Sequence, residues 1–179
     1  MLSDERKPRI GIVFYSRSGT GRAVADRLAT SSGWPLHEIR DAVPRMGLSG
    51  DLRCVADRLL GRRPSVRYAG PSLDIYDHVI LITPVWLRGL ASPMRAFLDT
   101  QRRMIRAYSV ICVMSGHGGF RAVDDIATQI GARPRSILLL RQHDVLAGET
   151  DGAVCRFKRQ ILAAAGPASP IEPLLPAVD

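Results

Sequence analysis

The stretch that best indicates the fold is RIGIVFYSRSGTGRAVADR, residues 9–27. An apolar run over 10–15 predicts a strand that is buried on both faces. The run stops at a hydroxyl- and glycine-rich turn, residues 16–21, and a helical pattern with Val24 and Leu28 follows at once. A strand, a small polar turn and a helix N-terminus in this order are typical of phosphate binding, because the first N–H groups of a helix have no partner within it.

Side chains of this turn add to the backbone donors. Hydroxyls come from Ser16, Ser18 and Thr20, and positive charge comes from Arg17 and Arg22. The turn lacks the lysine of a nucleoside-triphosphate P-loop and the third glycine of a dinucleotide-binding turn. A terminal phosphate monoester is the ligand that this turn favours. The alternative is an ordinary strand–helix turn in which serine and threonine cap the helix.

Composition limits the class of protein. With 179 residues, of which 46% are hydrophobic, the chain is expected to form one domain with a sizeable core. No apolar run approaches the ~20 residues of a membrane span, and the charged N-terminus is unlike a secretory signal, so a cytoplasmic protein is expected. The net charge is +8, but the arginines are dispersed, which speaks against nucleic acid as a partner. The three cysteines lack metal-site spacing and are expected to be small buried residues: Cys54, Cys112 and Cys155.

Strand and helix patterns alternate along the chain. Strands are predicted over residues 9–15, 35–40, 78–83, 109–115 and 136–141. Helices are predicted over residues 21–30, 51–60, 93–105, 121–130 and 151–165. This alternation indicates an α/β fold, a doubly wound five-stranded parallel sheet in three layers. Residues 1–165 are expected to form the single domain, and residues 166–179 a proline-rich tail.

Two further loops leave strand ends at the edge where such sheets bind ligands. The loop after residue 83 holds Trp86 between Pro84 and Pro93, and it suits one wall of a site for a planar aromatic ligand. Alternatively, Trp86 covers the core at the sheet edge. The loop after residue 115 is rich in glycine, and His117 or Phe120 would supply the opposite wall.

Three stretches together resemble the FMN-binding, flavodoxin-fold family of the short-chain type. They are residues 15–20, residues 76–98 with Thr83-Pro84-Val85-Trp86 at their centre, and residues 115–119. The resemblance covers residues 9–165 and implies the strand order 2-1-3-4-5. It implies that the first loop binds the FMN phosphate and that the other two sandwich the flavin ring. The residues so implied to bind FMN are Ser16, Arg17, Ser18, Gly19, Thr20, Gly21, Pro84, Val85, Trp86, Leu87, Arg88, Gly89, Ser115, Gly116, His117, Gly118, Gly119 and Phe120.

The resemblance also implies redox chemistry. The function expected first is an oxidoreductase that passes electrons from NAD(P)H through FMN to a quinone or another small acceptor. The alternatives are an electron carrier between protein partners and a flavin-free scaffold on the same fold. Carrier flavodoxins are typically acidic, whereas this basic chain would attract anionic NADPH. Flavin reductases of this fold often form homodimers. No catalytic residue and no metal site is predicted.

Three positions carry separate expectations. The family's phosphate loop has a hydroxyl residue where this chain has Gly21. Either Thr20 or an arginine takes over its role, or FMN binds more weakly. Arg88 is expected to favour the reduced, anionic flavin. His117 either serves the ring, as a hydrogen-bonding group or a proton donor, or is an exposed loop residue with no role.

Overall fold

The elements were assigned in a computed structural model that describes residues 7–42 and 64–164. Its strands are β1 (Ile10–Tyr15), β2 (Leu36–Asp41), β3 (Val66–Tyr68), β4 (His78–Trp86), β5 (Gly89–Leu90), β6 (Tyr108–Met114) and β7 (Ile137–Arg141). Its helices are α1 (Thr20–Ser32), α3 (Ser92–Gln101), α4 (Gly119–Ile130), α5 (Gln142–Ala147) and α6 (Asp151–Ala164). Two short 3₁₀ helices, η1 (Leu73–Ile75) and η2 (Arg102–Met104), complete the described elements.

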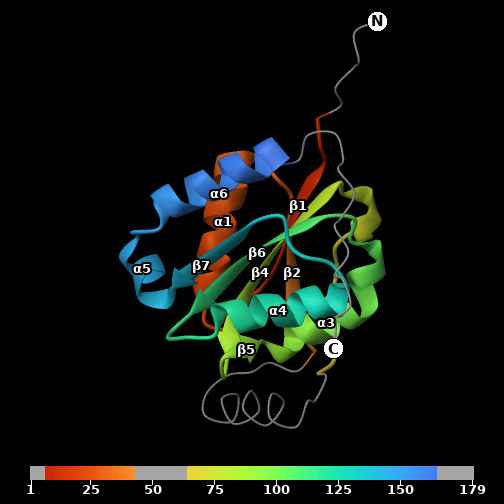
Figure 1. The fold of residues 1–179 in the computed structure, drawn as a ribbon, viewed down its shortest axis with the longest axis horizontal. Coiled ribbons are helices and arrows are strands. Elements are labelled where there is room, and N and C mark those ends of the chain that lie inside the picture. The colour runs from red at the N-terminus through yellow and green to blue at the C-terminus, as the bar shows by residue number, and fades with distance from the viewer. Residues whose placement is uncertain (1–6, 43–63, 165–179) are drawn as a thin grey trace, which may run out of the picture.

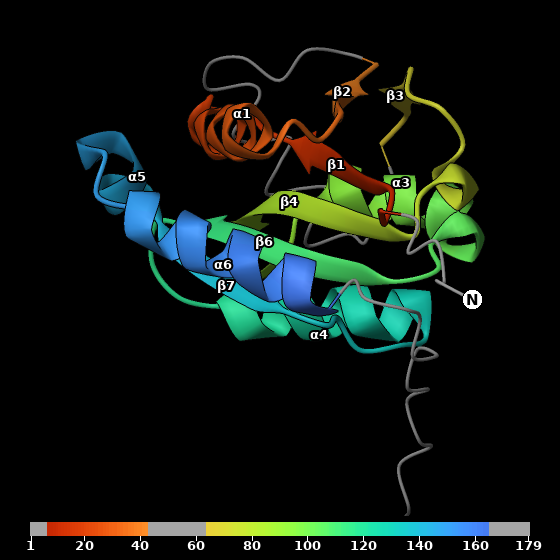
Figure 2. The same cartoon turned by 90° about the horizontal axis from the view of Figure 1, so that it is seen from above.

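The parallel strands follow the predicted order. β2, β1, β4, β6 and β7 lie side by side, which is the order 2-1-3-4-5 among the predicted strands. Two antiparallel strands were not predicted: β3 lies outside β2, and β5 pairs with the end of β4. Figure 2 shows β2 and β3 at one edge of the sheet and β7 at the other. Strands of two or three residues are too short to produce a recognisable alternation in sequence.

Strands β1, β4 and β6 are buried on both faces, as their apolar runs predict. In β1, Ile12 and Phe14 belong to the core layer under α1, α5 and α6, whereas Val13 and Tyr15 belong to the layer under α3 and α4. Successive side chains of a strand point to opposite faces, so a continuous apolar run fills two layers at once. The three-layer arrangement is visible in Figure 1, with α1 and α6 on one side of the sheet and α3 and α4 on the other.

Several predicted bounds shift in the structure. The strand predicted over 78–83 continues to Trp86, and the helix predicted over 93–105 ends at Gln101 and continues as η2. Helix α5 was not predicted. The helix predicted over 51–60 and the tail over 166–179 lie outside the described residues.

The cysteines differ from one another in their surroundings. Cys112 lies fully buried in β6, and burial raises the pKa of its thiol to about 12. Cys155 is exposed on α6, so the expectation of a buried residue is wrong there. The side chain stays outside because the buried residues of that helix, Val154, Phe157 and Ile161, lie on a different face. Cys54 is outside the described residues.

Two classes of feature are absent from residues 7–42 and 64–164. No helix there combines the length and the apolar composition that crossing a bilayer requires. No group of three or more His, Cys, Asp and Glu side chains gathers there to hold a metal ion.

His78 should make the stability of the fold depend on pH. It is buried at the start of β4, where its Nε2 bonds to the Ser109 hydroxyl, and burial and the nearby charge of Arg135 lower its pKa to about 4. The unfolded histidine, with a pKa near 6.5, therefore binds a proton that the folded one refuses. Stability should be constant above pH 6.5 with respect to this group and should fall by about 3 kcal/mol as the pH drops from 6.5 to 4.

Denaturant unfolding of the wild type and of His78→Gln between pH 7.5 and 5.5 tests this expectation, since few carboxylates titrate in that range. In His78→Gln, the unfolding free energy should change with pH much less steeply than in the wild type. His143→Gln, at an exposed histidine, controls for the loss of one imidazole. Equal slopes in the wild type and His78→Gln would contradict the assignment.

Candidate functional site

A polar cavity of about 110 Å³ opens at the carboxyl edge of the sheet. It is lined from four strand ends, because β1, β4, β6 and β7 are parallel and end at the same edge. The lining residues are Ser16, Arg17, Ser18, Thr20, Gly21, Pro84, Val85, Trp86, Val113, Ser115 and Gln142. Two of the three predicted loops, those expected after residues 15 and 83, supply most of the wall.

The N-terminus of α1 faces this cavity without a side-chain cap. The residue at the N-cap is Gly19, with a left-handed φ of 86°, and no side chain bonds to the first turn. The alternative in which serine and threonine merely cap the helix is therefore wrong. The first turn also contains no acidic residue. Its N–H groups and the positive end of the helix dipole remain available to an anion.

The hydroxyl groups of the turn fit the same purpose. The Ser16 Oγ is buried and has no hydrogen-bond partner among the described residues. The Ser18 and Thr20 hydroxyls bond to each other at 3.2 Å. Because buried hydroxyls nearly always have a partner, the lone Ser16 Oγ is available to a water or to a ligand oxygen in the cavity. An oxyanion such as a phosphate ester fits this set of donors.

Two positions of this turn behave differently from the sequence expectation. Arg22 pairs with Glu38, and its guanidinium lies over the Phe14 ring rather than in the cavity. A Cβ at position 21 would lie 3.3 Å from both the Cβ and the Oγ of Ser16, a tight contact that a small shift of Ser16 would have to relieve.

Trp86 both packs against the core and lines the cavity. Its ring meets the buried Tyr15 ring edge to face, with centroids 5.7 Å apart at 80°. Tyr15 is itself fixed, because its hydroxyl donates to Asp41 Oδ2 at 2.7 Å. The indole is half-buried and therefore offers part of its surface to a ligand. Trp86 therefore covers the core, as one of the two alternatives predicted, and its role as a wall for a planar ligand stays a prediction.

The loop predicted after residue 83 is a β-hairpin. Val85 pairs with Leu90 and Trp86 with Gly89, so the turn consists of Leu87 and Arg88 alone. Both turn residues have positive φ, 45° and 63°, as a tight two-residue hairpin requires. This conformation costs a residue other than glycine roughly 1–2 kcal/mol. Such strain persists where surrounding contacts impose it, and it is frequent beside functional sites.

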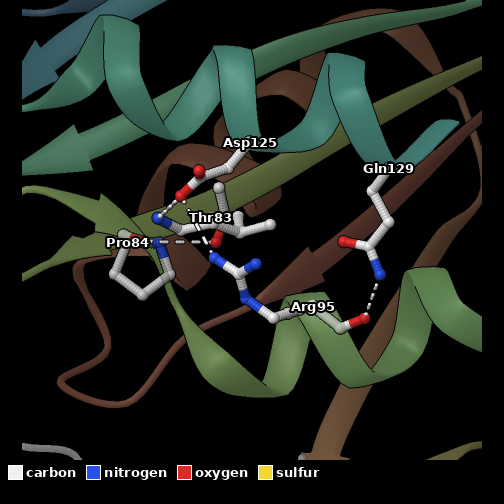
Figure 3. A network of polar contacts seen from close by, with 6 residues as sticks. Thr83, Pro84, Arg95, Asp125 and Gln129 are labelled. Atoms are coloured by element: carbon white, nitrogen blue, oxygen red, sulfur yellow. Dashed lines mark hydrogen bonds and ion pairs between the residues drawn. The ribbon is translucent and has the colours of Figure 1, made fainter. Parts of the chain in front are cut away.

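A polar network in Figure 3 holds this hairpin against the helices. Asp125, on α4, accepts hydrogen bonds from the Leu90 N–H at 3.0 Å and from Arg95 at 3.1 Å. Gln129, one turn later, donates to the Arg95 carbonyl at 2.7 Å and to Asp99 Oδ1 at 2.6 Å. The carboxylate thus joins β5, α3 and α4, and it fixes the end of β4 that carries Trp86.

Replacing Asp125 by alanine should loosen the cavity wall. The Leu90 N–H is buried and would lose its acceptor, and Arg95 would lose its counter-ion. We expect a loss of about 3 kcal/mol in unfolding free energy and about 1 kcal/mol for Asp125→Asn, which keeps an acceptor oxygen. Thermal and denaturant unfolding measure both. Asp124→Ala, at the exposed neighbour on α4, is the control, and equal losses for Asp124→Ala and Asp125→Ala would contradict the network's role.

The third predicted loop touches the hairpin. A Cβ added to Gly118, whose φ is 101°, would lie 2.4 Å from the Cα of Arg88, so the two backbones are in direct contact. Ser115 alone of the loop lines the cavity. The predicted site residues outside the lining are Gly19, Leu87, Arg88, Gly89, Gly116, His117, Gly118, Gly119 and Phe120. A ring sandwiched between the two loops stays a prediction.

Sequence reasoning missed two lining residues, Val113 and Gln142. Val113 lies inside the predicted fourth strand, near its carboxyl end. Gln142 directly follows the predicted fifth strand. The rule that ligands bind beyond the carboxyl ends of parallel strands applies to that strand too, so the rule would have found Gln142.

Comparison with known proteins places this architecture. No family model matches the chain, and no curated protein matches it in sequence. Its structure is similar to a flavoprotein from Lactobacillus acidophilus NCFM in complex with FMN, with a TM-score of 0.64, 16% identity, and coverage of 79% of this chain and 97% of that one. It is also similar to oxidised flavodoxin 1 from Bacillus cereus, with a TM-score of 0.52, 16% identity, and coverage of 86% and 97%.

The chain has a flavodoxin-like fold. A third solved structure agrees, a flavodoxin, WrbA-like protein from Agrobacterium tumefaciens, with a TM-score of 0.56, 15% identity, and coverage of 88% of this chain and 97% of that one. In flavodoxin-like sheets the strand order reverses beside the first strand, and ligands bind at this switch point. Here the switch lies between β1 and β4, and both strands end at the cavity.

Proposed function

We propose that this chain binds FMN and acts as an oxidoreductase, passing electrons from NAD(P)H to a quinone or another small acceptor. The observation that carries the proposal is the cavity in which an uncapped helix N-terminus, the lone Ser16 hydroxyl and the Trp86 indole meet at the switch point. A ligand with a phosphate at one end and a flat aromatic group at the other matches these features.

Two groups of residues would hold FMN, one at its phosphate and one along the rest of the molecule. Ser16, Ser18, Thr20 and the first N–H groups of α1 would hold the phosphate. Pro84, Val85 and Trp86 would lie along the rest of the ligand. When bound, FMN supplies the redox chemistry, and the protein binds it, orients it and adjusts its potential.

The residues around the contact between Arg88 and Gly118 form the rim of the site. Their chemistry suits an anionic, partly aromatic substrate such as NAD(P)H. Leu87 is 52% exposed and Phe120 is 68% exposed, and they flank the contact between Arg88 and Gly118. Within the described ranges, neither Arg88 nor Arg121, in the first turn of α4, has an ion-pair partner. Exposed apolar groups beside unpaired cations suit a nicotinamide ring with its phosphates.

The same rim supports the second candidate, an electron carrier between proteins. Two large apolar side chains exposed on neighbouring turns are also typical of a protein docking surface. The carrier would dock an acidic partner, because the rim is basic. The two candidates differ in whether reduced nicotinamide alone delivers electrons.

Anaerobic spectroscopy tests the proposal. Protein stripped of any ligand is titrated with FMN while flavin fluorescence is followed, and NADPH and then a soluble quinone are added. Saturable quenching followed by bleaching with NADPH and recovery with quinone would support the enzyme. Quenching without bleaching would favour the carrier, and no quenching at all would leave a flavin-free scaffold.

Arg88→Ala should lower the two-electron reduction potential of bound FMN by about 30 mV, which corresponds to about 1.4 kcal/mol. A cation beside the ring favours the reduced, anionic form, and its removal withdraws that stabilisation. Potentiometry measures the shift. Arg106→Ala, near the opposite edge of the sheet, is the charge-matched control. Equal potentials for Arg88→Ala and Arg106→Ala would contradict the role.

Two further expectations accompany the proposal. We place the protein in the cytoplasm, where NAD(P)H is available, and we expect a homodimer. Sedimentation analysis of the purified protein measures the second.

A further inference from the structure

Gln142 is a cavity residue that none of the recognised motifs contains. It is the first residue of α5 and follows the last residue of β7, so it enters the cavity from a strand end that the three loops do not include. It is half-buried and shares the lining with the phosphate-binding turn, Ser16–Gly21. The question is what its amide does there.

One hydrogen bond, at the exposed side of the cavity, orients the amide. The Ser115 hydroxyl donates to the Gln142 Oε1 at 2.7 Å. With its oxygen engaged in this way, the amide has its Nε2 group left as a donor. In the described part of the chain that nitrogen has no partner. The cavity therefore contains a positioned, neutral N–H donor as well as the groups of the α1 turn.

The turn offers a limited number of side-chain donors. Gly21 provides no hydroxyl, and a Cβ at that position would be in tight contact with Ser16. Ser18 and Thr20 share a hydrogen bond, which uses one of their two hydroxyl protons. A phosphate ester carries three terminal oxygens that each accept more than one hydrogen bond, so an additional donor from the facing strand end would complete its shell.

We propose that Gln142 is a phosphate-binding residue of this site and that Ser115 positions it. Its Nε2 donates to the phosphate ester held at the N-terminus of α1. This supplies the donor that Gly21 lacks and makes the site select phosphorylated over unphosphorylated ligands. The inference rests on the proposed function for the identity of the ligand as FMN, but not for the binding of phosphate.

Two variants separate the contributions. Gln142→Leu removes the amide at similar size, and Gln142→Glu replaces the donor by a carboxylate of nearly the same shape. Gln160→Glu, at an exposed position of α6, introduces the same charge away from the cavity. FMN and riboflavin affinities are measured by fluorescence quenching, and the shift of the apoprotein's melting temperature by inorganic phosphate is measured against chloride at equal ionic strength.

We expect FMN to bind about 10-fold more weakly to Gln142→Leu and at least about 100-fold more weakly to Gln142→Glu, with riboflavin affinity changed less than about 3-fold in both. Gln160→Glu should behave as the wild type. Equal weakening of FMN and riboflavin, or no weakening of either, would overturn the role of Gln142.

The phosphate measurement keeps this inference apart from the proposed function. If the wild type binds no flavin, the proposed function fails, and the phosphate shift decides the inference. A shift present in the wild type and lost in Gln142→Leu upholds Gln142 as a phosphate ligand. A shift that is absent in the wild type, or unchanged in the variant, overturns it.

Discussion

Gly118→Ala is expected to be the most damaging of the conservative substitutions at this site. The added methyl group would lie 2.4 Å from the Cα and 2.7 Å from the carbonyl carbon of Arg88, and the residue would keep an unfavourable φ of 101°. The backbones of two loops would have to separate, since no flexible side chain is there to yield. We expect a loss of at least about 3 kcal/mol in unfolding free energy and at least a 10-fold loss of FMN affinity.

Variants of two other glycines distinguish the steric contact from the backbone strain as the cause of that loss. Gly131 has a φ of 84° but nothing within 4 Å of an added Cβ, so Gly131→Ala reports conformational strain alone, about 1 kcal/mol. Gly116 has open space and no left-handed φ, so Gly116→Ala should change stability by less than about 0.5 kcal/mol. Denaturant unfolding of all three variants measures the series. If Gly118→Ala costs no more than Gly131→Ala, the contact between the loops does not hold the hairpin.

Ser18→Asp is expected to move protein stability and ligand affinity in opposite directions. Ser18 is exposed just before α1, whose N-terminus has neither an acidic residue nor a side-chain cap. A carboxylate there interacts favourably with the helix dipole, so the apoprotein should gain about 0.3–1 kcal/mol. The same carboxylate would repel a bound phosphate, and FMN affinity should fall at least about 100-fold.

The measurement combines apoprotein melting with titrations of FMN and riboflavin. Riboflavin has no phosphate, so its affinity should change by less than about 3-fold. Ser18→Ala, which removes the hydroxyl without adding charge, should lower FMN affinity by no more than about 10-fold. Equal weakening of FMN and riboflavin by the aspartate would mean that the phosphate does not lie at this turn.

The rim formed by Leu87, Arg88, Phe120 and Arg121 is basic and partly apolar. Arg88 and Arg121 lie on neighbouring turns beside exposed Leu87 and Phe120. A reductant with phosphates and an acidic protein partner would both be attracted by this charge, and raising the salt concentration should slow the approach of either. The anaerobic reduction by NADPH therefore separates the two functions where charge alone does not.

Local patterns in the sequence were sufficient to predict the five parallel strands and helices on both faces of the sheet, but not β3, β5 or α5. The run over 10–15 is apolar without interruption because its alternate side chains fill two different core layers, and that requires helices on both faces of the sheet. The five parallel strands lie in the order that the resemblance implied. The turn over 16–21 is recognisable in the sequence because small residues before a helix leave its first N–H groups open to an anion in any protein.

The details of the site depended on contacts between segments distant in sequence. Gly118 and Arg88 are thirty positions apart, and nothing local indicates that their backbones touch. Asp125, on α4, accepts a hydrogen bond from β5 and so helps to hold the hairpin that forms where a loop was predicted. Gln142 reaches the turn over 16–21 because parallel strands end at one edge, and the rule for strand ends could have predicted it from the sequence. Sequence patterns report the periodicity of one element, whereas the contacts of Gly118 and Asp125 arise from packing between elements, so the tertiary structure alone revealed those two.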